Sequence, residues 1–207
     1  KAMALLLQDT LNRLGHDEIT TVCCDNVLGA RSLVDHLYES GYRRIAYVAG
    51  LTRTVIGMTR YSAFTSRLAE LGMRFVGSAS RDAYSYEAGW QCTLELLPQQ
   101  PDAIFFANDI LALGGLDAMH RHGASGEIGA VGFDDIPMAG WPGYSLTTYR
   151  QPIAAMVART IELLGAASAP PVLHALPGEL VVRDSTARAG KKRARAGRDR
   201  PRTPGAV

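Results

Sequence analysis

Short apolar runs alternate with longer segments of mixed character along most of this chain. The two clearest runs lie at residues 102–107 and 128–133, where polar side chains are few. A continuous apolar run of this length is typical of a strand buried on both faces of a parallel sheet. Residues 30–37 instead place their apolar side chains at the spacing of one helix face. Strands that alternate with helices predict an α/β fold with largely parallel sheets and right-handed crossovers.

The same pattern predicts the order of the elements. Strands are expected at residues 4–7, 20–24, 44–50, 75–79, 102–107, 128–133, 146–149 and 180–183. Helices are expected after Asn26 as far as Ser40, and at residues 57–71, 85–97, 110–122 and 153–164. The alternation breaks at residues 134–145, where no helix of ordinary length fits. This irregularity predicts a crossing between two lobes.

The basic charge of the chain is confined to its end. Residues 191–207 hold seven Lys and Arg side chains against Asp199, a net charge of +6, so the other residues carry −4 of the overall +2. This end segment is rich in Pro, Gly and Ala and lacks apolar periodicity, which predicts a disordered tail over residues 189–207. The mildly acidic remainder has no electrostatic footprint of a nucleic-acid-binding domain.

Composition and cysteine usage favour a cytoplasmic globular protein without a membrane span. Hydrophobic residues make up 47% of the chain and charged residues 20%, and no apolar stretch approaches the roughly 20 residues that cross a bilayer. Residues 3–7 are too short for the core of a signal peptide. Cys23, Cys24 and Cys92 form no disulfide framework, as expected in a reducing compartment. No Cys or His spacing indicates a metal site.

Two predicted strands end in residues that could bind a polar ligand. Asn108 and Asp109 follow the run at 102–107, and Asp134 and Asp135 follow the run at 128–133. Ligands of parallel α/β sheets bind at the carboxyl ends of the strands. Asn108 and Asp134 are therefore expected at a binding cleft. The alternative is that Asn108 or Asp109 only caps the helix that starts at residue 110.

Arg60 and Tyr84 are further candidates for this cleft. Arg60 lies near a helix start, where its charge opposes the helix dipole. Bidentate bonding to a ligand diol or carboxylate would explain the position, and a solvated arginine is the alternative. Tyr84 precedes the helix at residues 85–97 and could stack on a sugar or a base. A surface or core aromatic is the alternative there.

The sequence contains no pattern for nucleotide binding or nucleophilic catalysis. It lacks the glycine spacings of phosphate-binding loops and the GxSxG pattern of serine hydrolases. Asp134 and Asp135 are neighbours on a strand, so their side chains are expected to point to opposite faces rather than share a proton. These absences argue against an enzyme, and no cofactor is expected.

Several motifs taken together resemble the effector-binding domain of LacI/GalR-family transcriptional regulators. They are TTVCCDN, RRIAYVAG, AND at residues 107–109, GFDD at 132–135, LTTYRQP at 146–152 and ELVVRDST at 179–186. The resemblance runs in order over residues 4–188. It implies two α/β lobes of the type I periplasmic-binding-protein kind, with the effector between them.

The resemblance also assigns roles to residues. Arg60, Asn108 and Asp134 match positions that hydrogen-bond the effector, usually a sugar or a purine, and Tyr84 matches a stacking position. Thr59 matches a loop that often adds a polar contact. The implied lobes are residues 1–42 with 147–188 for an incomplete first lobe, and residues 43–146 for the second. Leu146–Pro152 would return the chain to the first lobe, where the helix at 153–164 would join the helix around 30–37.

The resemblance implies a homodimeric effector sensor that reaches DNA only through a DNA-binding domain absent from this chain. Either the chain is a fragment of a longer regulator or its gene product is truncated. A periplasmic-type solute-binding protein shares the fold and is the alternative function. A sugar-modifying enzyme is a third class, and it lacks a nucleophile or a base here.

Overall fold

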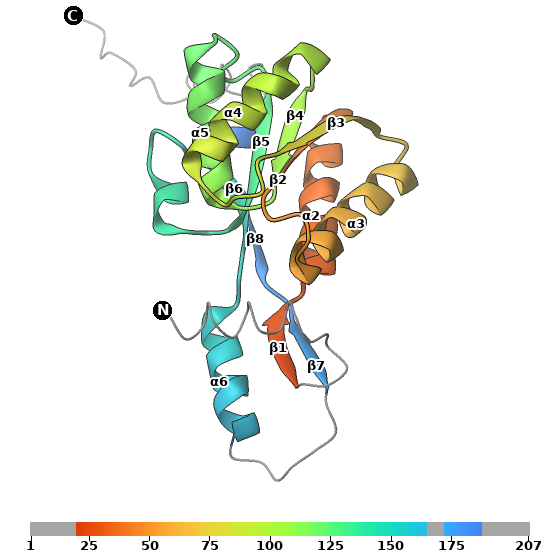
Figure 1. Cartoon of the computed structure of the whole chain (residues 1–207), viewed down its shortest axis with the longest axis vertical. Helices are drawn as coiled ribbons and strands as arrows, with labels where there is room; N and C mark the ends of the chain where they lie inside the picture. Colours follow the sequence, from red (N-terminus) through yellow and green to blue (C-terminus); the bar gives the residue numbers. More distant parts are fainter. Residues whose placement is uncertain (1–19, 165–171, 188–207) are drawn as a thin grey trace, which may run out of the picture.

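Two sheets of unequal size organise the chain in its computed structural model, which describes residues 20–164 and 172–187 (Figure 1). The larger sheet has six strands in the order β3-β2-β4-β5-β6-β8, all parallel to their neighbours except β8, which is antiparallel to β6. The smaller sheet pairs β1 with β7 in parallel. The strands are β1 (Thr21–Cys24), β2 (Arg44–Ala49), β3 (Arg74–Ser80), β4 (Ala103–Phe106), β5 (Gly129–Asp134), β6 (Thr147–Arg150), β7 (Leu173–Leu176) and β8 (Glu179–Val181).

Helices cover both faces of the larger sheet, because α2 packs with α3 and α4 packs with α5 on the other side (Figure 1). Side-chain oxygens of Asp25, Thr54, Ser85 and Asn108 cap the four helices at their start, as short polar residues do at these positions. The helices are α2 (Asn26–Glu39), α3 (Val55–Glu70), α4 (Tyr86–Leu96), α5 (Asp109–Arg121) and α6 (Ile153–Leu164), with short 3₁₀ turns η1 (Leu97–Gln99), η2 (Pro137–Gly140) and η3 (Asp184–Thr186). The predicted α/β class is confirmed.

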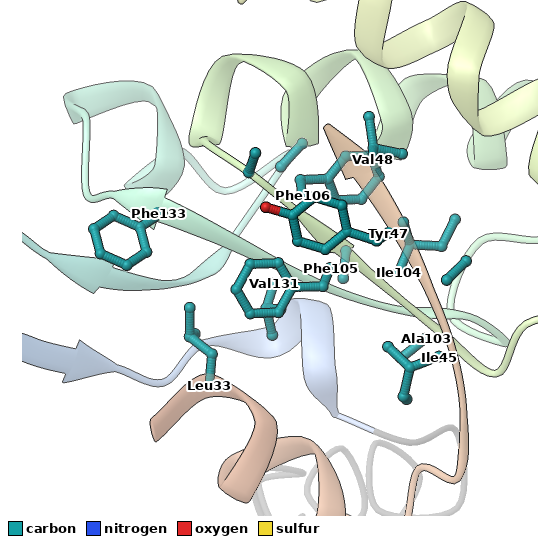
Figure 2. Packing of buried hydrophobic residues seen from close by; sticks show 14 of the residues in the cluster. Leu33, Ile45, Tyr47, Val48, Ala103, Ile104, Phe105, Phe106, Val131 and Phe133 are labelled. Carbon is teal, nitrogen blue, oxygen red and sulfur yellow. The ribbon is translucent and has the colours of Figure 1, made fainter. Parts of the chain in front are cut away.

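The core lies around the central strands of the larger sheet. All four residues of β4 are buried, as the continuous apolar run at this position predicts. Phe105 on this strand stacks on Tyr47 of β2 with ring centroids 5.4 Å apart, and Phe64 of α3 packs 5.1 Å from it. Figure 2 shows Leu33, Phe105 and Val131 within the same buried cluster. The central strands are therefore held by a continuous buried cluster.

Three short connections join the larger body to the part that contains β1, β7 and α6 (Figure 1). They are Asp25 between β1 and α2, residues 151–152 between β6 and α6, and residues 177–178 between β7 and β8. We call these the three crossings. The segment at 134–145 is not one of them, contrary to expectation. It runs through η2 and leads into β6, which pairs with β5 in the same sheet.

The larger body also contains elements that the sequence analysis assigned to the first lobe. Helix α2 packs on α3, β6 and β8, and both of these strands belong to the six-stranded sheet. Gly29 allows this close approach, since a Cβ there would lie 2.7 Å from ring atoms of Phe133 and Tyr149. The connections between this body and the part that contains β1, β7 and α6 are the three crossings. Helix α6 lies with β1 and not with α2, and none of its residues is buried.

Most predicted elements agree with the structure to within a few residues. Strand β7 was not expected, because His174 interrupts its short apolar run. The last strand ends at Val181 rather than Arg183. The expected strand at residues 4–7 and the expected tail at 189–207 lie outside the described residues.

Candidate ligand-binding site

The carboxyl ends of β2, β4 and β5 meet at one edge of the larger sheet, because these strands are parallel neighbours. Gly50 follows β2, Ala107 follows β4, and Asp134 is the last residue of β5, with Asp135 after it. This edge faces the three crossings (Figure 1). Asn108 and Asp134, which the sequence pattern placed at strand ends, therefore lie at the same edge of the sheet.

Arg60 is a buried cation at this edge, with a side chain from the first turns of α3. Its residue is only 5% exposed. Its Nη1 donates a hydrogen bond to the Ala107 carbonyl, and its Nη2 donates to Asn26 Oδ1 at 2.7 Å. Its Cζ lies 3.5 Å from the centre of the Phe133 ring, a cation–π contact.

Two features of Arg60 are unusual for a structural arginine. Its Nε is buried and has no hydrogen-bond partner among the described residues. Within residues 20–164 and 172–187, no carboxylate forms an ion pair with its guanidinium. Buried charges are normally paired and hydrogen-bonded. Arg60 is therefore neither the solvated arginine that the sequence allowed nor a fully satisfied core residue.

Asp134 lies at the end of β5 and is within electrostatic reach of Arg60. Its backbone has a φ of +122°, and its Oδ1 accepts a hydrogen bond from Gln151 Nε2 at 2.6 Å. Burial raises the pKa of the Asp134 carboxyl, although the positive charge of Arg60 and the Gln151 hydrogen bond act in the opposite direction. The edge thus presents one cation and one carboxylate in a poorly solvated setting.

Asn108 caps α5, as the structural alternative proposed. Its Oδ1 accepts a hydrogen bond from the Leu111 amide at 3.0 Å. The side chain is partly exposed, and within the described part of the chain its Nδ2 donates no hydrogen bond. Capping therefore uses only the acceptor of the amide, and the donor stays available for a ligand.

Tyr84 lies against Gly50 at the end of β2. A Cβ on Gly50 would overlap the Tyr84 ring, so the glycine is needed for this close contact. Burial raises the pKa of Tyr84, while Arg60 and a hydrogen bond with Thr54 lower it. Its residue is 36% exposed, which leaves part of the side chain accessible. Thr59 is partly exposed one position before Arg60.

Three residues of this edge escaped the sequence analysis, namely Asn26, Phe133 and Gln151. Asn26 could have been noticed, since it follows a strand just as Asn108 does. The contact of Gln151 with Asp134 carries no local signal, because 17 positions separate the two residues. The stacking of Phe133 under Arg60 depends equally on tertiary packing.

The neighbours of the predicted carboxylate and carboxamide have structural roles. Asp135 forms ion pairs with Arg150 at 2.6 Å and Arg183 at 2.7 Å; burial opposes ionisation, but these arginines lower the pKa of its carboxyl. Asp109 is fully buried and accepts hydrogen bonds from Thr148 and the Ile136 amide. Asp134 and Asp135 thus have different partners, as predicted from their adjacent positions.

Among the described residues we find neither a metal-binding cluster nor a membrane-spanning helix. No group of three or more His, Cys, Asp or Glu side chains that could hold a metal ion occurs among them. Within the same residues, no helix is both long and apolar enough to span a bilayer. All three cysteines are free thiols.

Comparison with known proteins agrees with this geometry. Residues 34–186 match the family described as periplasmic binding protein-like domain. The chain is 35% identical to the HTH-type transcriptional regulator GalS of Salmonella typhimurium over 70% of its length and 45% of the relative. It is 34% identical to the lactose operon repressor of Klebsiella pneumoniae over 79% of its length and 49% of the relative. The chain spans about half the length of these curated relatives.

Solved structures give the same result. The Lac repressor bound to ONPG superposes with a TM-score of 0.73 and 27% identity, over 81% of this chain and 53% of that one. The complex of the transcriptional regulator CelR with cellobiose superposes with a TM-score of 0.74 and 28% identity, over 82% and 54%. Both neighbours were solved in complex with a small molecule.

Proposed function

This chain belongs to the family of periplasmic binding protein-like domains, in the form found in LacI/GalR-type transcriptional regulators, and from that premise we propose that it binds a small polar effector at the edge around Arg60 and Asp134. The effector class is a sugar or a purine-like molecule. Asn108 and Tyr84 complete the site, and Thr59 is a further candidate at its margin.

The observation that carries this proposal is the incomplete bonding of Arg60. A guanidinium has five N–H donors in a planar fork, and here the Nε–H is buried without an acceptor. An unmet buried donor costs about 1–3 kcal/mol. A ligand hydroxyl or carboxylate oxygen that accepts a hydrogen bond from this Nε–H would remove that cost on binding.

The surrounding groups favour a polyol or a heterocycle over a simple anion. Asp134 accepts hydrogen bonds and repels anions, Asn108 offers a free amide donor, and Tyr84 presents an aromatic surface. Vicinal hydroxyls can donate to a carboxylate while accepting from a guanidinium. A sugar satisfies both charges of the site at once. The binding of cellobiose by CelR supports this class.

In a regulator, this site would act by shifting a conformational equilibrium. An effector that binds one arrangement of the two lobes more tightly biases the population towards it. We propose that the active species is a cytoplasmic homodimer and that operator binding belongs to a part of the regulator outside this sequence. The relatives are named as transcriptional regulators and repressors rather than enzymes, which supports a role without catalysis.

A thermal-shift screen of the 207-residue chain tests the proposal. The compounds are cellobiose, lactose, ribose and a purine nucleoside, each at increasing concentration. A ligand present at 100 times its Kd stabilises the protein by about 2.7 kcal/mol, which raises the Tm by roughly 5–10 °C for a domain of this size. Isothermal titration then gives the Kd for the compound that responds.

Two substitutions assign the response to the site. Asp134→Ala is expected to cost roughly 1.5–3 kcal/mol of affinity, the range for a hydrogen bond to a charged group, and Arg60→Met is expected to abolish the shift. Arg67→Met is the matched control, since Arg67 lies on the same helix and pairs with Asp35 and Glu70 instead. Full affinity in both site variants would refute the proposed site. Turnover of a responding sugar would favour the enzyme class.

A further inference from the structure

Asn26 uses both ends of its carboxamide, and the two ends contact different parts of the molecule. Its Oδ1 accepts the hydrogen bond from Arg60 Nη2 at 2.7 Å, and its Nδ2 donates to the Cys24 carbonyl at 2.9 Å. Arg60 belongs to the larger body, whereas Cys24 is the last residue of β1 in the smaller part. Asn26 is 8% exposed, so water competes little for either bond.

The contact at Cys24 falls on the first of the three crossings. Asp25 forms this crossing, and its amide donates to the Leu176 carbonyl at the end of β7 at 2.8 Å. Its side chain caps α2 through the Leu28 amide at 2.8 Å. Residues 24–26 therefore join β1, β7 and the start of α2 over three positions. Any movement of the smaller part has to change dihedral angles here.

We infer that Asn26 is a positioning residue that couples Arg60 to the first crossing. Its Oδ1 holds the guanidinium from one side. If the guanidinium moves, Asn26 can move with it, and its hydrogen bond to the Cys24 carbonyl then changes. The inference rests on the proposed function, because it names how occupancy of that site reaches the connection between the two parts.

The physical basis is competition for one donor group. The bonds of Arg60 to Ala107 and Asn26 are both made by terminal nitrogens, and both acceptors are neutral oxygens. A ligand oxygen that approaches Nη2 either shares it with Asn26 or replaces Asn26. A replaced Asn26 loses its anchor, and the bond to Cys24 is then free to rearrange. The ligand thus has different contact energies in the two arrangements, which a conformational change requires.

The second crossing has a comparable arrangement. Gln151 lies between β6 and α6, and its Nε2 donates to Asp134 Oδ1 at 2.6 Å. Arg60 and Asp134 are therefore each bonded to a carboxamide side chain at a crossing or directly beside one. This second, independent contact supports a specific role for the Asn26 carboxamide.

Hydrogen exchange of the full chain, without ligand, tests the coupling. The variants are Arg60→Met, which keeps a long apolar side chain over Phe133, Asn26→Ala, and the double substitution. Exchange is followed by mass spectrometry in peptides that cover residues 20–27 and 172–178. We expect each single variant to exchange roughly five-fold faster at the crossing, the effect of losing one hydrogen bond of about 1 kcal/mol. The double variant should be no faster than Asn26→Ala alone.

Two controls distinguish the loss of the Arg60–Asn26 coupling from a general destabilisation of the fold. Arg67→Met should leave the crossing peptides at the wild-type rate, and residues 103–106 of β4 should stay protected in all variants. If Arg60→Met exposes β4, Arg60→Gln replaces it, because this shorter side chain keeps a polar group but lacks the guanidinium fork that donates to both Ala107 and Asn26. The inference is overturned if the Arg60 variant leaves the exchange rate of the crossing peptides unchanged. It is also overturned if the two single effects multiply, so that exchange in the double variant is roughly 25-fold faster than in wild type. Since no ligand is used, this outcome is independent of the thermal-shift screen.

Discussion

Replacing Asp109 with Asn is expected to remove a specific pH dependence of stability. The Asp109 carboxylate is fully buried and accepts hydrogen bonds from Thr148 Oγ1 at 2.6 Å and from the Ile136 amide at 2.9 Å. Burial is the largest influence on it and raises its pKa from 3.8 to about 6, against the effect of these two hydrogen bonds. The neighbouring carboxylates of Asp134 and Asp135 raise it further.

The sign of the effect follows from proton binding. Because the folded-state pKa lies above the unfolded value, the folded protein binds more protons between pH 3.8 and about 6. Stability therefore falls as the pH rises through this window. A shift of roughly two pKa units corresponds to about 3 kcal/mol in total, at 1.36 kcal/mol per unit. Between pH 4.5 and 7.5 the wild type should lose about 2 kcal/mol relative to Asp109→Asn, whose amide is neutral throughout.

Urea denaturation of both proteins at pH 4.5, 6.0 and 7.5 measures this difference directly. Comparing the two proteins at each pH cancels the titration of groups that do not interact with Asp109. Glu70→Gln is the control: Arg31 and Arg67 lower the pKa of Glu70 to about 2, so both its folded and unfolded pKa values lie at or below 4.5. The effect of Glu70→Gln on the free energy of unfolding should therefore change little between pH 4.5 and 7.5. If the stability difference between Asp109→Asn and wild type is the same at pH 4.5 and 7.5, the argument from burial is wrong.

Two further predictions concern packing and thiol reactivity. Gly89→Ala should destabilise the protein by about 1–3 kcal/mol in urea denaturation, because a Cβ would overlap the Leu111 carbonyl where α4 meets α5. Gly143→Ala is the control: the space around Gly143 is open, and its free energy of unfolding should stay within about 0.5 kcal/mol of wild type. Iodoacetamide at pH 8 should leave Cys24 unmodified in the folded protein, since burial raises its pKa to about 12, and mass spectrometry that finds native Cys24 alkylated as fast as the unfolded chain would contradict this.

Local sequence was sufficient to predict most of the elements and the sheet edge at which Asn108 and Asp134 lie. Helix ends coincided with Gly72 and Gly123, because both adopt the left-handed conformation that a glycine tolerates. The run at 102–107 became the fully buried β4. Because side chains alternate along strands and parallel strands share a direction, the placement of Asn108 and Asp134 at one edge followed from the same pattern.

Tertiary structure decided which elements pack together and which polar groups meet. Helical periodicity shows that α2 has an apolar face, but not that Gly29 brings it against Phe133 and Tyr149 in the larger body. The roles of Asp109 and Asn26 depend on partners as distant as Thr148 and Arg60 along the chain. Burial and hydrogen bonding depend on which residues are close in space. A local sequence pattern shows only which face of an element is apolar and has to be covered. The sequence therefore determined the elements and their direction, and packing determined what each polar side chain does.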